Sequence, residues 1–341
     1  MKIASLALLP LLALTACDSQ PAYEWSGSGD DAAPTAPPLE NARLQLELSS
    51  EINLEAAGIV LYGPDSGIMG VRYAGYGPVS CEFDVVAGEV LDDYDYDGGD
   101  ETVDDFGGYG GVHTAVITTQ GGVVLHTPFT PAANAEQEDD QMYVGGAPTF
   151  KVEGVVEARL GLDEVVALRH VDGGCAVHWL DSDQQTSVPD GLCARGFDVD
   201  PATGTAWASS EDDGLYRITP QGAEFIADAG KRLVWDESTR TLYVAGAQRG
   251  VVEARDDSGA LLWSTPVNGY LRDMVPLAGH QAVAVLNHEA TIELLDVHTG
   301  EIVGRQILPG TVRELAASPS GDTLLMARSG VTSVFSVSAI D

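Results

Sequence analysis

The sequence predicts an all-β fold built from a repeated four-stranded unit. Three observations lead to this prediction: a motif recurs about every forty residues, strands of five or six residues alternate with turns rich in Pro, Gly and Asp, and helical periodicity is almost absent. The chain has 341 residues, of which 44% are hydrophobic and 39 are glycine. It can therefore bury a core, which excludes a largely disordered protein.

The repeat is clearest in the second half of the chain, where an arginine opens each unit in steps of 37, 40 and 41 residues: Arg195, Arg232, Arg272 and Arg313. Each unit begins with a short apolar strand and a turn. A second strand follows, as at 241–245 and 281–286, and then a third strand that ends in a polar turn. A fourth strand comes after this turn, as at 260–265 and 302–307. Four strands per forty residues are typical of a β-propeller blade.

Two segments resemble repeats of the WD40, YVTN and quinoprotein-like propeller superfamily, namely LDVHTGEIVG at 295–304 and SPSGDTLLMA at 318–327. In those families, Asp-x-x-Thr-Gly-Glu joins the two outer strands of a blade and Ser-Pro-x-Gly precedes the second strand. The resemblance covers about 195–341 and is weak before it. It implies a propeller but no particular activity, because such propellers serve as enzymes, scaffolds and binding platforms.

Continuing the period upstream places units near 155–194, 108–154 and 55–107, which makes seven in all. The segment 44–341 has room for seven blades of about 42 residues. The last unit has room for only three strands. The alternating segment 44–48, Leu-Gln-Leu-Glu-Leu, can supply its fourth strand, which would close the ring and remove two exposed edges. Six blades, eight blades and a pair of β-sandwiches are the alternatives.

The N-terminus has the features of a secretory signal at 1–16. Lys2 precedes an apolar stretch at 3–14 that is too short to span a bilayer, and small residues follow. Leu14-Thr15-Ala16-Cys17 resembles the bacterial lipobox. This resemblance implies that Cys17 is acylated after cleavage, that the protein is exported, and that the lipid anchors it to the inner or outer membrane of the cell envelope. An ordinary signal peptide is the alternative.

The segment 17–43 is rich in Ser, Gly, Ala and Pro, and we expect it to be a flexible tether ahead of a folded domain at 44–341. The chain carries 52 acidic and 17 basic side chains, a net charge of -35. Phosphate groups would be repelled, so nucleic acid is excluded as a partner. The expected partners are the membrane, through the lipid anchor, and envelope proteins or a small ligand.

Between Tyr73 and Phe150 there are 15 acidic residues and no Lys or Arg. One segment reads D-x-D-x-D-G-x-x-E-x-x-D and resembles the calcium loops of EF-hands and integrin-type propellers. Alternating carboxylates before a glycine allow a loop to wrap around Ca²⁺. The candidate ligands are Asp93, Asp95, Asp97, Gly99, Glu101 and Asp104. The alternative is a solvated acidic loop, which is also our expectation for the second acidic run at 136–140.

Three cysteines remain after Cys17. Cys175 and Cys193 are 18 residues apart in the sequence, a separation that two neighbouring strands can close. We therefore expect them to form a disulfide, with three buried thiols as the alternative. The arginines that open the repeat precede the innermost strands. They can line the mouth of a channel and attract an anion, or they can form salt bridges between blades.

Four tryptophans recur at 28-residue steps: Trp179, Trp207, Trp235 and Trp263. This interval differs from the repeat, so we expect them to occupy different blade positions and to pack between blades.

Common nucleophile motifs are absent from the sequence. We therefore expect a non-enzymatic, membrane-anchored binding or scaffolding platform. The alternative is a propeller enzyme, such as a quinoprotein-type dehydrogenase, a lactonase or a lyase. The quinoprotein interpretation is weakened because vicinal cysteines and a repeated tryptophan docking motif are missing.

Overall fold

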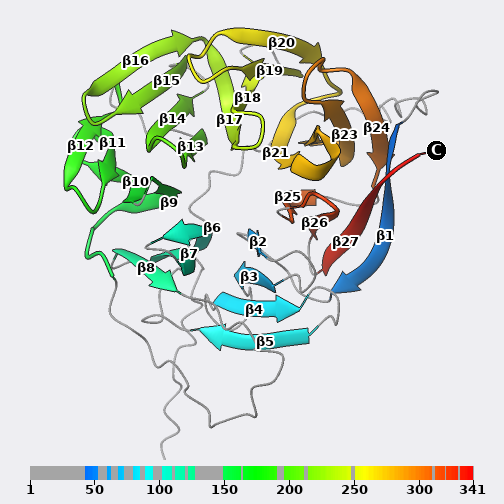
Figure 1. Cartoon of the computed structure of the whole chain (residues 1–341), viewed down its shortest axis with the longest axis horizontal. Coiled ribbons are helices and arrows are strands. Elements are labelled where there is room, and N and C mark those ends of the chain that lie inside the picture. Colours follow the sequence, from blue (N-terminus) through cyan, green and yellow to red (C-terminus); the bar gives the residue numbers. More distant parts are fainter. Residues whose placement is uncertain are drawn as a thin grey trace, which may run out of the picture. The chain divides into compact units, whose positions relative to one another are not determined.

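The computed structural model of the chain is shown in Figure 1. It describes residues 43–52, 60–62, 68–72, 80–84, 89–94, 102–109, 112–119, 122–126, 149–162, 164–189, 196–210, 214–246, 250–308, 312–318, 320–328 and 331–340. The predicted signal segment, Cys17 and the tether up to residue 42 lie outside these ranges.

The described strands form antiparallel sheets, and every sheet except the last is made of strands that follow one another along the chain. The first sheet contains β2 (Val60–Tyr62), β3 (Ile68–Arg72), β4 (Ser80–Asp84) and β5 (Glu89–Tyr94). The next contains β6 (Thr102–Tyr109), β7 (Val112–Thr119) and β8 (Gly122–His126). A third contains β9 (Val155–Gly161), β10 (Glu164–Val171), β11 (Gly174–Trp179) and β12 (Gln184–Ser187).

The second half of the chain continues this arrangement. One sheet contains β13 (Gly196–Asp200), β14 (Thr205–Ser210), β15 (Gly214–Thr219) and β16 (Gly222–Ala227). Another contains β17 (Ala229–Asp236), β18 (Thr241–Gly246), β19 (Val251–Arg255) and β20 (Leu261–Pro266). A further sheet contains β21 (Leu271–Leu277), β22 (Ala282–Asn287), β23 (Thr291–Asp296) and β24 (Ile302–Ile307).

The last sheet joins the two ends of the chain. It contains β25 (Val312–Ala317), β26 (Thr323–Arg328), β27 (Val331–Ala339) and β1 (Leu44–Ile52). Strand β1 pairs antiparallel with β27, from Leu44 opposite Ala339 to Ile52 opposite Thr332. The expectation that 44–48 supplies the fourth strand of the final unit is therefore confirmed.

The repeat predicted from the sequence agrees with the sheets of the second half. Strand β13 begins directly after Arg195, while Arg232 and Arg272 lie inside β17 and β21. Further upstream, the unit expected at residue 155 begins there with β9. The boundary predicted between residues 107 and 108 is wrong, because β6 runs from Thr102 to Tyr109 across it. Its Gly- and Asp-rich sequence resembles a turn more than a strand, which explains the error.

Within the described residues, six sheets have four strands and the β6–β8 sheet has three. On the free side of β8, Phe150 pairs with Val123 through two backbone hydrogen bonds, each of 3.0 Å. The first strands of successive sheets also contact one another. These contacts run from β2 through β6, β9, β13, β17 and β21 to β25, and β25 in turn contacts β2.

The hydrophobic core lies between neighbouring sheets. One cluster joins the β21–β24 sheet to the last sheet and includes Leu294, Leu315 and Phe335. Every residue of β22 is buried, whereas most residues of the outer strand β16 are exposed. A strand covered on both faces needs no alternation of polar and apolar residues, which explains the continuous run Ala-Val-Ala-Val-Leu in β22.

The four tryptophans occupy four different strand positions. Trp179, Trp207, Trp235 and Trp263 lie on the third, second, first and fourth strands of their sheets. Trp207 stacks on Trp235 of the next sheet, with ring centroids 6.2 Å apart and planes at 13°. The indole N–H groups of Trp179 and Trp263 donate to Gly204 O and Val297 O of the following sheets. The expectation that they pack between repeats is confirmed.

Apart from the strands, one short 3₁₀ helix, η2 (Ala278–His280), lies wholly within the described residues. No helix in this part of the chain is both long enough and apolar enough to cross a membrane.

The Trp207–Trp235 contact provides a test of packing between sheets. We expect Trp207→Ala to lower the free energy of unfolding by about 3–5 kcal/mol, because a fully buried indole is removed. The control is Phe225→Ala on β16, whose side chain is 54% exposed and whose loss should cost no more than about 1 kcal/mol. Denaturant titration of both variants measures the difference, and equal destabilisation would contradict the interpretation.

Candidate functional site

Charged side chains on the first strands link neighbouring sheets. Asp198 on β13 accepts the backbone N–H of Trp235 on β17 at 2.7 Å, and its other oxygen accepts the N–H of Val199 at 2.9 Å. Arg159 on β9 places its Nε 3.5 Å from Asp198 Oδ1 and also pairs with Glu157. One carboxylate therefore connects three consecutive sheets.

Asp273 on β21, two sheets further along the chain, makes a corresponding set of contacts. Its Oδ2 accepts the N–H of Leu315 on β25 at 2.8 Å, and its Oδ1 accepts the N–H of Met274 at 3.0 Å. Desolvation raises the pKa of Asp273, and the negative charge of Glu157 adds to the rise. The positive charge of Arg232 and the two N–H donors oppose this shift without cancelling it.

These contacts bear on the arginines that open the repeat. The positive charge of the exposed Arg232 on β17 acts electrostatically on Asp273 of the next sheet. Arg272 lies on β21, whereas Arg195 and the side chain of Arg313 lie outside the described residues. The anion site therefore stays a prediction. Arg159 was missed by the sequence reasoning because it does not open a repeat unit.

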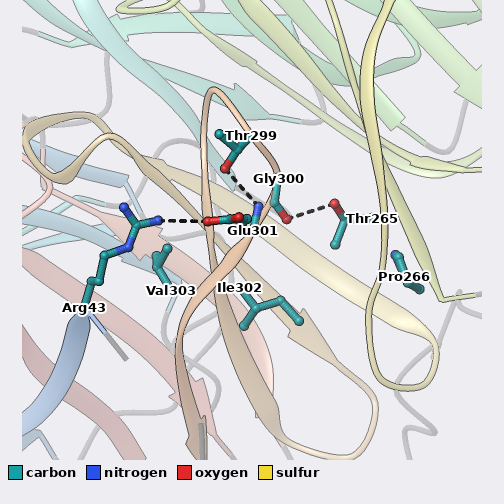
Figure 2. Close-up of a pocket in the computed structure, with 8 residues that line it drawn as sticks. All are labelled: Arg43, Thr265, Pro266, Thr299, Gly300, Glu301, Ile302 and Val303. Atoms are coloured by element: carbon teal, nitrogen blue, oxygen red, sulfur yellow. Dashed lines mark hydrogen bonds and ion pairs between the residues drawn. The ribbon is translucent and has the colours of Figure 1, made fainter. Parts of the chain in front are cut away.

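The candidate binding site is an open groove of about 690 Å³ between the outer strands β20 and β24. Figure 2 shows the residues that line it. They are Arg43, Thr265, Pro266, Thr299, Gly300, Glu301, Ile302 and Val303.

One wall of the groove is the turn that carries the Asp-x-x-Thr-Gly-Glu motif. Asp296 Oδ1 accepts the N–H groups of His298 and Thr299, each at 3.0 Å, and the Thr299 hydroxyl at 3.1 Å. Desolvation acts to raise the pKa of Asp296. These donors and the charge of Arg43 outweigh it, so the pKa is lowered overall. The motif thus forms a rigid turn around one ionised carboxylate.

Gly300 allows this turn to approach the neighbouring sheet. Its φ is 71°, and an added Cβ would lie 2.6 Å from the Trp263 ring and 2.5 Å from Thr265 Oγ1. The Thr265 hydroxyl donates to Gly300 O at 2.8 Å (Figure 2). A glycine is therefore required here both for its backbone conformation and for the close contact between β20 and the turn.

Arg43 closes one end of the groove. Its Nη2 lies 3.4 Å from Asp296 Oδ2 and 3.6 Å from Glu301 Oε2, and its backbone N–H donates to Val303 O at 2.7 Å. Figure 2 shows the guanidinium of Arg43 directed towards the carboxylate of Glu301.

The groove offers hydrogen-bonding groups rather than a catalytic pair. Both of its threonine hydroxyls, on Thr265 and Thr299, are already bonded within the protein. Neither histidine nor cysteine is among the described residues that line it. A reaction that needs an activated nucleophile would require a base next to that nucleophile.

The other predicted site residues are only partly described. Cys175 on β11 is buried and disulfide-bonded, but Cys193 lies outside the described residues, so their pairing stays a prediction. Asp93 lies in β5, and Asp104 lies in β6 at an irregularity in its pairing with β7.

The remaining calcium candidates, Asp95, Asp97, Gly99 and Glu101, lie outside the described residues, as does Cys17. Within the part of the chain that the structure describes, no group of three or more His, Cys, Asp or Glu side chains is placed to hold a metal ion.

Asp273 provides a test through pH. Because the pKa of Asp273 is raised in the folded state, the contribution of this carboxyl to stability is complete at pH values below its unfolded-state pKa of about 3.9. The contribution is lost as the pH rises through the folded-state pKa. We expect the wild type to lose stability relative to Asp273→Asn as pH rises from about 4. Denaturant titration at several pH values measures this difference. Met274→Leu, the control, should keep the wild-type pH dependence, and an identical profile for Asp273→Asn would contradict the prediction.

Comparison with known proteins adds no family to this description. No protein-family model matches the chain, and a search of curated proteins also finds no match.

Proposed function

We propose that the chain is a lipid-anchored binding platform of the bacterial cell envelope, in which a closed seven-bladed propeller presents its grooves and loops to partner proteins. The observation that carries this proposal is the groove between β20 and β24, whose described lining includes polar groups but no nucleophile paired with a base. The proposed role is binding rather than catalysis.

The closed propeller is supported by the order and contacts of the strands. Among the described strands, six four-stranded sheets and the β6–β8 sheet make seven units, and Phe150 pairs beside β8 where a fourth strand would lie. The contacts of the first strands return from β25 to β2, and β1 completes the last sheet. A ring closed in this way leaves only short outer edges, which limits edge-to-edge association.

The membrane anchor is supported by the lipobox-like tetrad that ends at Cys17 and by the composition of 17–43. The domain begins with β1 directly after this segment. Several acyl chains on one cysteine hold a protein at a membrane firmly, since each buried methylene contributes about 0.8 kcal/mol.

The choice of partner is supported by charge. Several exposed carboxylates lie on turns, including Asp183 (91% exposed side chain), Glu301 (74%) and Asp322 (68%). A partner with basic groups at its surface would be attracted to such a surface, whereas nucleic acid would be repelled.

Anchoring and partner binding can be tested together in cells. Cys17→Ser should abolish incorporation of labelled fatty acid and move the protein from the membrane pellet to the supernatant. A photo-crosslinking residue at Glu301 should yield an adduct with an envelope protein, and the same residue at Gln185, on the outer strand β12, serves as the control. Adducts of equal yield at both positions, or none at Glu301, would contradict the groove as the binding site.

Calcium binding by 93–104 is a further part of the proposal. We expect millimolar calcium to raise the Tm of the wild type by a few degrees, because an ion that binds only the folded state stabilises it. The double variant Asp95→Asn, Asp97→Asn should lose this shift. The matched control is Glu136→Gln, Glu138→Gln in the second acidic run, which should keep it. A wild type whose Tm does not respond to calcium or to a chelator would show that the site does not exist.

A further inference from the structure

Arg43 joins two different sheets through its backbone. Its N–H donates to Val303 O on β24 at 2.7 Å, and its carbonyl accepts the N–H of Ile340 at 2.9 Å, just after β27. Arg43 therefore lies between the edge of the β21–β24 sheet and the end of the last sheet, although the strand it precedes, β1, belongs only to the latter.

The side chain of Arg43 strengthens the same connection. Its guanidinium is within 3.6 Å of both Asp296 and Glu301, which lie at the two ends of the β23–β24 turn. The Arg43 and Glu301 side chains are largely exposed, so each ion pair by itself contributes little. Together with the backbone bond to Val303, however, they hold one residue at three points on the same sheet.

The strand opposite Arg43 is shaped for this contact. Gly304 on β24 lies so close to β1 that an added Cβ would be 2.6 Å from Leu44 O. This distance is shorter than any normal contact between a methyl carbon and a carbonyl oxygen. A side chain at position 304 would push the beginning of β1 away from β24.

The position of these contacts decides how β1 detaches. Strand β1 is antiparallel to β27, and its N-terminal end at Leu44 lies opposite Ala339. A force applied from the N-terminal side reaches Arg43 first and then separates the β1–β27 pairs one after another. The contacts of Arg43 must therefore break before this sequence can begin.

We propose that Arg43, with Val303, Asp296 and Glu301, forms a latch that holds β1 in the last sheet when the chain is pulled from its N-terminal side. The source of that pull rests on the proposed membrane anchor, since a tethered domain transmits force through 17–43. Without β1, the core cluster around Phe335 and Val337 would lose Leu44 and become exposed to water.

The latch can be tested on the full chain, with handles at its two termini, in optical tweezers. We expect Arg43→Ala, which removes both ion pairs, and Gly304→Ala, which pushes the start of β1 away from β24, each to release β1 roughly two to ten times faster than the wild type at a given force. Hydrogen exchange of amides 44–46 and 337–339 should also accelerate. The control is Arg217→Ala, which removes the ion pair to Glu224 within the β13–β16 sheet and should leave the release of β1 unchanged.

A release rate for Arg43→Ala equal to that of the wild type would overturn the proposal. Should a variant fail to fold, the wild type itself supplies the test, because high salt screens the two ion pairs and should speed the release of β1. A wild-type release rate that does not depend on salt would also overturn the latch. Neither measurement involves a membrane, so its outcome is distinct from that of the Cys17 acylation test.

Discussion

The arrangement of the sheets depends on one kind of hydrogen bond, in which a carboxylate on one sheet accepts a backbone N–H from the next sheet. Backbone ladders hold each sheet together, but the apolar packing between sheets is not directional. Asp198 and Asp273 supply direction, because each fixes one N–H of the next first strand. Desolvation makes this contact costly for Asp273, and a positive charge on the preceding sheet reduces the cost.

The groove between β20 and β24 is a consequence of how two sheets meet at their outer strands. Near the β23–β24 turn the two sheets approach as closely as Gly300 permits. The indole N–H of Trp263 and the hydroxyl of Thr265, both on β20, donate to backbone oxygens of this turn. The groove lies beside this contact, between the two outer strands. The same Asp-x-x-Thr-Gly-Glu motif that marks the repeat therefore also builds one wall of the groove.

Much of the fold could be predicted because strand positions depend on local patterns. The forty-residue period located the sheets from Arg195 onward, and the alternation at 44–48 identified the strand that completes the last sheet. The contacts of Arg43, Arg159 and Asp198 could not be predicted, because they depend on the distance between sheets, and sequence spacing carries no information about that distance. The predicted unit boundary fell inside β6 because the glycines and aspartates of this strand have low strand propensity. Pairing with β7 nevertheless holds the segment in a strand.

The pairing of β1 with β27 has a consequence for the order of events during biosynthesis. A chain is synthesised from its N-terminus, so β1 is among the first strands to appear, while β27, its only partner within the last sheet, is the last. Throughout that interval β1 has an unpaired edge and a face with Leu44 and Leu46. Glu47 and Glu51 in the same strand place negative charge beside these leucines, which discourages pairing with other chains while the correct partner is still missing.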